Sequence, residues 1–329
     1  MASRDGNLTR ILVGDVGGTH ARFAQVDIPA AGTWRIHARQ DLAGAFPTFE
    51  DALRRYFEQM PQAARPGTAA IAVAGPVSAG SARFTNRGWT ISESELKRFG
   101  FERAVLINDF AALAFAVEIL GAADLRTLGP ELPGEAGATI SIIGAGTGFG
   151  VSCLARYGQR AVPMATEGGH IGFAPSDADE VAVLEALWRQ NERVSVERLL
   201  SGPGIETLHR TLEALAGRNA EALSAAEVVA RARQGDAGCH RALTMFCSIF
   251  GTVAGDIALA HGARGGVYIA GGIAEKIEPF LLSSPFRARF ESKGRLSSFV
   301  SSVPTRLIVN PDAAMLGAAR AGLLLADNS

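Results

Sequence analysis

A glycine-rich turn near the start of the chain carries residue types that can bind phosphate. The segment 15–20, Asp-Val-Gly-Gly-Thr-His, lies between two apolar runs, residues 11–13 and 21–26. Paired glycines between such runs are typical of a tight hairpin, in which glycine supplies a positive φ. The same turn can be a concave anion site, with backbone N–H groups facing a phosphate, the Thr19 hydroxyl as a further donor and the Asp15 carboxylate facing a hydrated Mg²⁺. Both interpretations fit this stretch.

Two further glycine clusters occur later in the chain. Residues 144–150, Gly-Ala-Gly-Thr-Gly-Phe-Gly, depart from the Gly-x-Gly-x-x-Gly dinucleotide fingerprint, and the chain has no Gly-Lys-Ser/Thr phosphate loop. They repeat the glycine–threonine chemistry of the first turn. Residues 265–266 and 271–272 flank the apolar run Val-Tyr-Ile-Ala, where glycine lets a flat ring approach the backbone. Each cluster alone can be explained by the needs of a tight turn or of close packing. Together the three clusters indicate a site that binds a nucleotide between two domains.

Three other segments contain polar side chains that are candidates for binding or catalysis. Asn108 and Asp109 close an apolar strand and open a helix, so they can project into a site from a rigid element. A helix N-cap is the simpler role for Asp109. Glu167 and His170 flank two glycines; a buried, hydrogen-bonded histidine and a metal pair are the alternatives, and two ligands alone make a weak metal site. By its local pattern, Glu197 is a solvated helix residue.

The elements that must position these residues alternate between strands and helices. Apolar runs predict strands at 10–15, 21–27, 69–74 and 104–107, and helical periodicity predicts helices at 42–60, 108–120, 178–191, 204–216 and 240–262. A second β-loop-β unit begins after residues 129–137, and Asp312 is expected to cap a last helix. The alternation predicts an α/β fold, and the repeated hairpin units predict two similar domains that face a cleft.

Composition and charge limit the classes of function. The chain has 329 residues, 47% of them hydrophobic and 20% charged, which favours a globular protein of two domains. A net charge of −1 gives no electrostatic reason to expect nucleic acid or a membrane surface as a partner. Three cysteines match no zinc spacing and favour reduced thiols in a cytoplasm, and no signal peptide is expected. The uncharged stretch 137–155 predicts strand, loop and strand rather than a membrane span.

Together these segments resemble the bacterial glucokinases, a family of sugar kinases in the actin–hexokinase–heat-shock-protein ATPase superfamily. The family's two phosphate segments are similar to GDVGGTHARFA and GAGTGFG, and its adenosine segment is similar to GGVYIAGGI. Its sugar-site segments resemble LINDFAALA, EGGHIGFAP and RVSVERLLSGPG. The resemblance runs in the family's order from about residue 10 to residue 320, and so covers nearly the whole chain.

The resemblance implies a fold, an activity and partners. The implied fold is α/β, with two actin-like (ribonuclease H-like) domains and a ligand cleft between them. The small domain would comprise residues 1–119 plus 312–329, and the large domain residues 120–311. The implied reaction is transfer of a phosphoryl group from ATP to the 6-hydroxyl of glucose, with Mg²⁺ as cofactor, at the entry to glycolysis. We expect a cytoplasmic homodimer without nucleic-acid or membrane partners.

The resemblance also implies roles for single residues. Asp109 would be the general base that accepts the proton of the sugar's 6-hydroxyl, and Asp15 would contact Mg²⁺ through water. The residues implied to bind the sugar are Asn108, Asp109, Glu167, His170 and Glu197, with Thr85 and Asn86 as further candidates. Those implied to bind ATP are Gly14, Asp15, Gly17, Gly18, Thr19, Gly146, Thr147, Gly148, Gly271 and Gly272.

The chain departs from the family's pattern at two positions, and other functions stay open. Many members have Asn in place of His20, and some have an acid in place of Gly172; the zinc-binding cysteines of a related kinase group are missing, so no structural zinc is expected. Asp109 and Glu167 also suit a glycosidase, a hypothesis that leaves both phosphate-type turns unexplained. A sugar sensor without catalysis is the third class. Residue types alone do not distinguish glucose from mannose as the sugar, or ATP from ADP or polyphosphate as the phosphoryl donor.

Overall fold

The computed structural model describes residues 8–17, 20–30, 33–43, 46–58, 60, 65–84, 88–158 and 160–327. The chain forms two compact units. Unit 1 consists of Met1–Leu120 and Asn310–Ser329, and unit 2 consists of Gly121–Val309. The chain therefore changes unit after residues 120 and 309, whereas the resemblance implied changes after residues 119 and 311.

Unit 1 is built on a five-stranded sheet with the order β3-β2-β1-β4-β7. Strands β1, β2 and β3 are antiparallel neighbours, and β1, β4 and β7 run parallel. The strands are β1 (Leu8–Val16), β2 (His20–Pro29), β3 (Arg35–Ala43), β4 (Thr68–Val73), β7 (Arg103–Asn108) and the small pair β5 (Ser81–Arg83) and β6 (Thr90–Ser92). The helices are α1 (Phe49–Phe57), α2 (Glu93–Phe99), α3 (Asp109–Ala116) and α12 (Ala313–Asp327).

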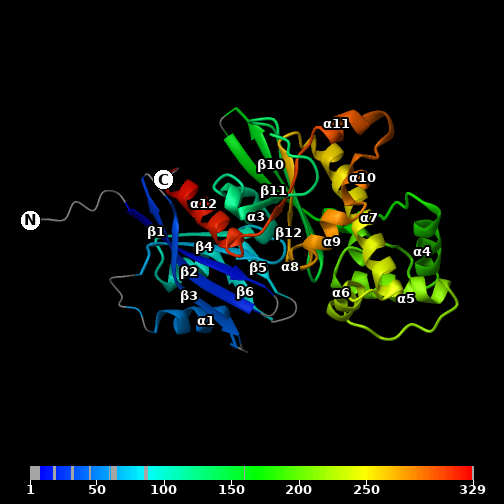
Figure 1. Ribbon diagram of the computed structural model, residues 1–329. Helices are drawn as coiled ribbons and strands as arrows, with labels where there is room; N and C mark the ends of the chain where they lie inside the picture. Colours follow the sequence, from blue (N-terminus) through cyan, green and yellow to red (C-terminus); the bar gives the residue numbers. More distant parts are fainter. Residues whose placement is uncertain are drawn as a thin grey trace, which may run out of the picture. The chain divides into compact units, whose positions relative to one another are not determined.

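The two faces of this sheet carry different helices because side chains alternate along a strand. Leu12 of β1 packs in a core cluster with residues of α1 and α2. Its neighbour Ile11 lies against α12, where a Cβ at Gly322 would be 3.3 Å from Ile11 Cδ1. Helix α12 also packs against α3, β4 and β7 (Figure 1). Unit 1 is thus a sheet between two helical layers, with α12 returning to it from the far end of the chain.

Unit 2 contains a six-stranded sheet with the order β11-β10-β9-β12-β13-β8. The strands are β8 (Leu125–Thr127), β9 (Ile140–Ala145), β10 (Phe149–Tyr157), β11 (Arg160–Thr166), β12 (Gly266–Ala270) and β13 (Thr305–Ile308). The α-helices are α4 (Ala178–Trp188), α5 (Gly202–Leu215), α6 (Ala225–Arg233), α7 (Ala237–His261), α8 (Gly272–Lys276), α9 (Glu278–Ser283), α10 (Phe286–Glu291) and α11 (Ser297–Ser301). Short 3₁₀ turns are η2 (Ala122–Asp124), η3 (Gly168–His170), η4 (Val196–Arg198) and η5 (Gly294–Leu296).

The two sheets share one topology. Strands β11-β10-β9-β12-β13 repeat the order of β3-β2-β1-β4-β7, with antiparallel pairs on one side of β9 and parallel pairs on the other. The β1–β2 and β9–β10 hairpins therefore occupy the same place in each unit. This repetition confirms the expected α/β fold with two similar domains.

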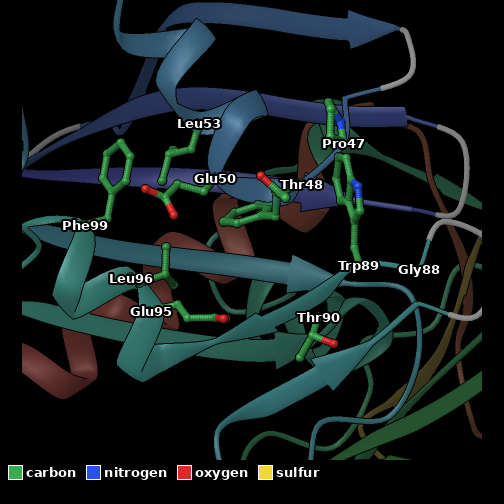
Figure 2. A pocket seen from close by; sticks show the side chains of 11 residues that line it. Pro47, Thr48, Glu50, Leu53, Gly88, Trp89, Thr90, Glu95, Leu96 and Phe99 are labelled. Atoms are coloured by element: carbon green, nitrogen blue, oxygen red, sulfur yellow. The ribbon is translucent and has the colours of Figure 1, made fainter.

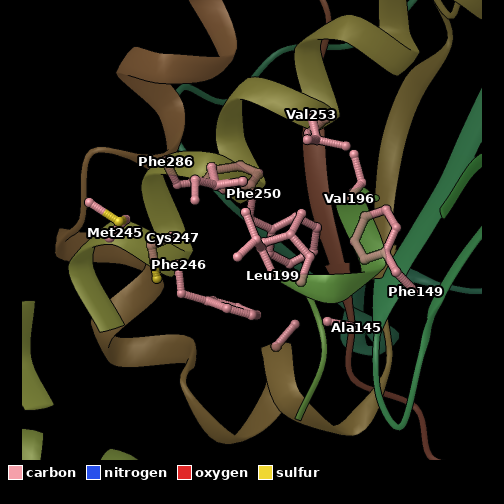
Figure 3. Packing of buried hydrophobic residues seen from close by; sticks show 14 of the residues in the cluster. Ala145, Phe149, Val196, Leu199, Met245, Phe246, Cys247, Phe250, Val253 and Phe286 are labelled. Carbon is pink, nitrogen blue, oxygen red and sulfur yellow. The ribbon is translucent and has the colours of Figure 1, made fainter. Parts of the chain in front are cut away.

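Helix α7 is the centre of the core of unit 2. It packs against α5, α6 and α10 and beneath β9 and β12. Figure 3 shows Phe246, Phe250 and Val253 of α7 among Phe286, Phe149 and other apolar side chains. Within the described part of the chain, α7 is the one helix long and apolar enough to cross a membrane, yet 83% of its most apolar window is buried inside the protein. Such burial is typical of the core helix of a globular unit.

The helix predicted over residues 42–60 begins later than expected. Leu42 belongs to β3, and α1 starts only at Phe49. Thr48 and Asp51 form a capping box, in which each side chain accepts the backbone N–H of the other residue. The capping box fixes the start of the helix, although the helical spacing of apolar residues predicts a start at residue 42. The sequence patterns also missed β3, β5, β6, β8, β11, β13, α2, α6, α9, α10 and α11, most of which are short or largely polar.

Candidate active site

The end of β7 and the start of α3 bring Asn108 and Asp109 out of the sheet of unit 1. Asn108 is the N-cap of α3: its Oδ1 accepts the backbone N–H groups of Phe110 at 3.0 Å and Ala111 at 3.1 Å. The structure therefore gives the capping role to Asn108 and places Asp109 at the first helical position. Both side chains are half-buried.

The Asp109 carboxylate is oriented by its neighbours. Its Oδ1 accepts Asn108 Nδ2 at 3.1 Å and the backbone N–H of Phe110 at 2.9 Å. The same Asn108 Nδ2 donates to the carbonyl of Gly75 at 3.1 Å. An amide side chain has two donor hydrogens and two acceptor lone pairs, and in Asn108 all four are used within the chain. A further ligand of Asn108 must replace or share one of these bonds.

Asp15 lies on β1 directly opposite Arg22 of β2. Directly opposed residues of an antiparallel pair share a face, so Asp15 Oδ2 and Arg22 Nη1 come within 3.4 Å. Arg39 pairs with Asp41 and with Asp312, which precedes α12. Burial raises the pKa of the Asp15 carboxyl, Asp41 and Asp312 add to the rise, and Arg22 and Arg39 oppose it. The hairpin register would have identified Arg22, which the sequence interpretation did not name.

The first glycine turn is described up to its edges. Val16 of β1 pairs with Ala21 of β2, which confirms the hairpin predicted at residues 15–20. Gly14 is buried, and a Cβ there would lie 2.9 Å from Ile71 Cδ1, so a larger residue would force the Ile71 side chain to move and core packing by itself favours glycine. Gly17 is the last residue described before the turn; Gly18, Thr19, Thr85, Asn86 and the side chain of His20 lie outside the described residues.

The second glycine turn joins β9 to β10 and is fully described. Gly146 N–H donates to Gly148 O at 2.8 Å, which closes a three-residue turn after Ala145. A Cβ at Gly146 would meet no atom within 4 Å, and Thr147 is exposed. The backbone of this turn is therefore accessible, as an anion-binding turn requires.

Glu167 and His170 are brought together by the 3₁₀ turn η3. In such a turn, side chains three apart lie on one side, and Glu167 Oε2 is 3.9 Å from His170 Nε2. The two intervening glycines have a packing reason: a Cβ at Gly168 would lie 2.9 Å from Val151 Cβ, and one at Gly169 would collide with the carbonyl of Phe149. The turn is thus pressed against β10. Both polar side chains are exposed, 70% for Glu167 and 56% for His170.

Glu197 joins this pair from the turn η4. Its Oε1 lies 3.9 Å from His170 Nε2, and its Oε2 accepts the backbone N–H of Phe149 at 2.8 Å. Val196 N–H donates to Ile171 O at 2.9 Å and holds the two turns side by side. Local pattern indicated only a solvated helix residue here, because 48 residues separate Phe149 from Glu197 and such a contact leaves no periodic signal.

The third glycine cluster lies between β12 and α8. Gly271 has a φ of +90°, and a Cβ there would collide with the carbonyl of Ala145 on β9. Gly272 opens α8, and a Cβ there would meet no atom within 4 Å. Gly271 is thus required by the fold. Gly272 leaves an open backbone surface in the unit that also carries the second glycine turn.

A pocket of unit 1 is separate from these residues. It has a volume of about 190 Å³ and lies between α1 and α2, with Thr48, Glu50, Trp89 and Phe99 among its lining side chains (Figure 2). None of the residues assigned from the sequence lines it. Among the described residues, no group of three or more His, Cys, Asp or Glu side chains is arranged to hold a metal ion.

Comparison with known proteins relates the whole chain to one family. The glucokinase family model matches residues 12–324. A glucokinase of Caulobacter vibrioides is 49% identical over 311 residues, which cover 94% of this chain and 93% of that protein. A crystal structure of a glucokinase from an Antarctic psychrotroph is 36% identical and superposes with a TM-score of 0.89, covering 98% of this chain and 100% of that chain.

A more distant structure shares the fold. A ROK family glucokinase from Streptomyces griseus, solved in complex with glucose and AMPPNP, is 19% identical. It superposes with a TM-score of 0.63 and covers 97% of this chain and 100% of that chain. The likeness extends the actin-like sugar-kinase fold to both units.

Proposed function

Because the chain belongs to the glucokinase family, we propose that it transfers the terminal phosphoryl group of ATP to the 6-hydroxyl of glucose. The products are glucose 6-phosphate and ADP. The observation that carries the proposed mechanism is the Asp109 carboxylate at the start of α3, oriented by Asn108 and by the N–H of Phe110. Phosphoryl transfer depends mainly on positioning and charge stabilisation, and an oriented carboxylate supplies the first.

In this mechanism Asp109 accepts the proton of the 6-hydroxyl as the oxygen attacks the phosphorus of the terminal phosphate. A positioned base is worth about 10²–10⁴-fold in rate. Glu167, His170 and Glu197 bind the remaining sugar hydroxyls, because carboxylates and an imidazole offer both acceptors and donors to vicinal hydroxyls. Asn108 contacts the sugar by sharing one of its present bonds, so its larger contribution is to orient Asp109.

The glycine turns bind the phosphates of ATP through backbone N–H groups. In the second turn, Gly146 N–H already donates to Gly148 O, so the N–H groups of Thr147 and Gly148 are the proposed donors, and the open space beside Gly146 and the exposure of Thr147 support this role. Gly17, Gly18 and Thr19 are the proposed counterparts in the first turn. Gly272 is the proposed neighbour of the adenosine. Asp15 fits a water-mediated Mg²⁺ contact, because Mg²⁺ keeps several waters and takes one or two carboxylates beside substrate phosphates. When bound, Mg²⁺ would neutralise charge on the phosphates.

We also propose a cytoplasmic homodimer that acts at the entry to glycolysis. The three cysteines are free and buried, which suits a reducing compartment. The tests are light scattering of the purified protein for the dimer and fractionation of cells for the compartment. A monomer, or recovery in a membrane fraction, would contradict these assignments.

A coupled assay for ADP tests the reaction. Glucose, mannose, fructose, N-acetylglucosamine and a blank without sugar are compared with Mg-ATP, and then ADP or polyphosphate replaces ATP as donor. Wild type is run beside Asp109→Ala, Asp109→Asn and the control Asp179→Asn, which removes an exposed carboxylate of unit 2. We expect turnover strongest with glucose, a loss of about 10²–10⁴-fold in both Asp109 variants and none in the control. No turnover with any sugar would overturn the proposal.

A further inference from the structure

Glu197 connects the sugar-binding residues of unit 2 to its phosphate turn. One carboxylate oxygen, Oε1, lies 3.9 Å from His170 Nε2. The other, Oε2, accepts the backbone N–H of Phe149, the residue that directly follows Gly148. We propose that Glu197 is a positioning residue for the second phosphate turn and couples the binding of sugar to the binding of nucleotide. The coupling rests on the proposed function, since it assumes that both ligands bind to these residues.

Gly148 is fitted to the Glu197 carboxylate. A Cβ at Gly148 would collide with Glu197 Oε2. The backbone of Gly148 is not in the left-handed region, so the conformation does not require glycine at this position. A Cβ at this position would instead require the Glu197 carboxylate, which is the end of a flexible side chain, to move from its place beside the Phe149 N–H. The Glu197 carboxylate therefore contacts the turn directly, and a substitution that moves the carboxylate removes this contact.

The segment that carries Glu197 holds the turn at a second point. Gly202 N–H donates to Gly146 O at 2.9 Å. Between the two contacts, Leu199 and Leu200 are fully buried in the core of unit 2 (their neighbours are shown in Figure 3). Residues 197–202 thus form a rigid support that grips both ends of the glycine turn. The buried leucines make this support a fixed part of the unit.

The two oxygens of one carboxylate cannot be oriented independently. A sugar hydroxyl that bonds Oε1 fixes the plane of the group, and with it the direction in which Oε2 accepts the Phe149 N–H. A phosphate on the turn acts on the same plane from the other side. Coupling between two binding equilibria is reciprocal, so glucose and nucleotide should tighten each other's binding by one common factor.

Glu167 is the natural control for a residue that only binds sugar. Its Oε2 lies at the same 3.9 Å from His170 Nε2. Its side chain is 70% exposed, against 32% for Glu197. A Glu167→Ala variant therefore removes a carboxylate from the sugar residues and leaves the Glu197–Phe149 bond in place.

Isothermal titration of the full chain with AMPPNP and Mg²⁺, without and with saturating glucose, measures the affinity for nucleotide and the effect of glucose on that affinity. Hydrogen bonds to charged groups correspond to about 10-fold or more in binding. We expect Glu197→Ala to weaken AMPPNP binding about 10-fold without any sugar, and to reduce the effect of glucose on AMPPNP affinity to near one. Glu197→Gln keeps an oxygen for the Phe149 N–H, so it should retain sugar-free AMPPNP binding while it weakens glucose binding. Glu167→Ala should weaken glucose binding alone.

A double-mutant cycle confirms the contact. Gly148→Ala should weaken sugar-free AMPPNP binding in the wild-type background and have little further effect in Glu197→Ala, because the colliding oxygen is then gone. Circular dichroism shows whether each variant is folded. Unchanged sugar-free AMPPNP affinity in a folded Glu197→Ala would overturn the inference. A wild type that binds AMPPNP but not glucose would instead overturn the proposed function and the coupling, while the AMPPNP data would still decide the role of Glu197 in the turn.

Discussion

The side-chain amide of Asn108 lies 3.1 Å from Oδ1 of Asp109, and the oxygen of the same amide caps the helix that Asp109 begins. One residue therefore stabilises the start of α3 and sets the orientation of the carboxylate beside it. Capping and catalysis were alternative roles for Asp109 at the level of sequence. The structure gives the capping role to Asn108, and catalysis stays the role proposed for Asp109.

Replacing Asn108 by Ala should lower kcat more than it raises KM for glucose. The variant loses the donor to Asp109 Oδ1 and both cap bonds, so we also expect a loss of about 0.5–2 kcal/mol in the free energy of unfolding. Steady-state kinetics and urea unfolding measure the two effects. Asn108→Ser restores a capping oxygen without the amide donor, and should recover stability but not kcat. A rise in KM at unchanged kcat would make Asn108 a sugar ligand only.

The buried ion pair of Glu180 and Arg289 should dominate the electrostatic stability of unit 2. Glu180 is 1% exposed, accepts Arg289 Nη2 at 2.5 Å and accepts the backbone N–H of Ser176 at 2.7 Å. Glu180→Ala leaves the Arg289 guanidinium with Asp177 and Thr252 as partners, and it removes the acceptor of the Ser176 N–H. The loss of hydrogen bonds at a buried charged group should cost about 1.5–3 kcal/mol in urea unfolding.

The exposed pair of Asp179 and Arg241, 2.9 Å apart on the same unit, is the matched control. Asp179→Ala should cost about 0–1 kcal/mol. Equal losses in the Glu180 and Asp179 variants would show that burial does not set the strength of the first pair.

The three thiols should be inert in the folded protein. Burial raises the pKa of Cys247 to about 12, that of Cys239 to about 11 and that of Cys153 above its usual value. Because the thiolate is the reactive form, Ellman's reagent at pH 8 should label none of them rapidly and all three after denaturation. Fast labelling of one native thiol would contradict the burial of that cysteine.

His261 should make the protein less stable in mild acid. Burial lowers its pKa from the ordinary value of 6.5, and its Nδ1 lies 2.8 Å from Ser141 Oγ. Below pH 6.5 the unfolded chain therefore binds more protons at His261 than the folded chain does. The contribution of neutral His261 to the free energy of unfolding is present above pH 6.5 and is lost as the pH falls below that value. Melting temperatures from pH 8 to pH 5 should fall more steeply in wild type than in His261→Gln. Parallel curves would exclude His261 as the cause.

The sequence by itself determined most of the local elements that carry the candidate site residues, and the types of side chain found there. The apolar runs that end at Asp15 and at Asn108 are strands. The second glycine–threonine segment is a hairpin turn, and the described residues on either side of the first one pair as in a hairpin. Such features depend on residues close together in the chain, where alternation and helical spacing report burial directly. The order of the motifs then indicated a sugar kinase before any contact was known.

Only the tertiary structure decided which side chains meet. Strand β3 is too polar to show a pattern, and its place at the sheet edge follows from pairing with β2. The cap of α3 depends on backbone angles at Asn108 that residue type leaves open. Glu197 reaches Phe149 across 48 residues because the buried core of unit 2 brings η4 under the glycine turn. Contacts between distant segments arise from packing of the whole unit, and no short window of sequence contains them.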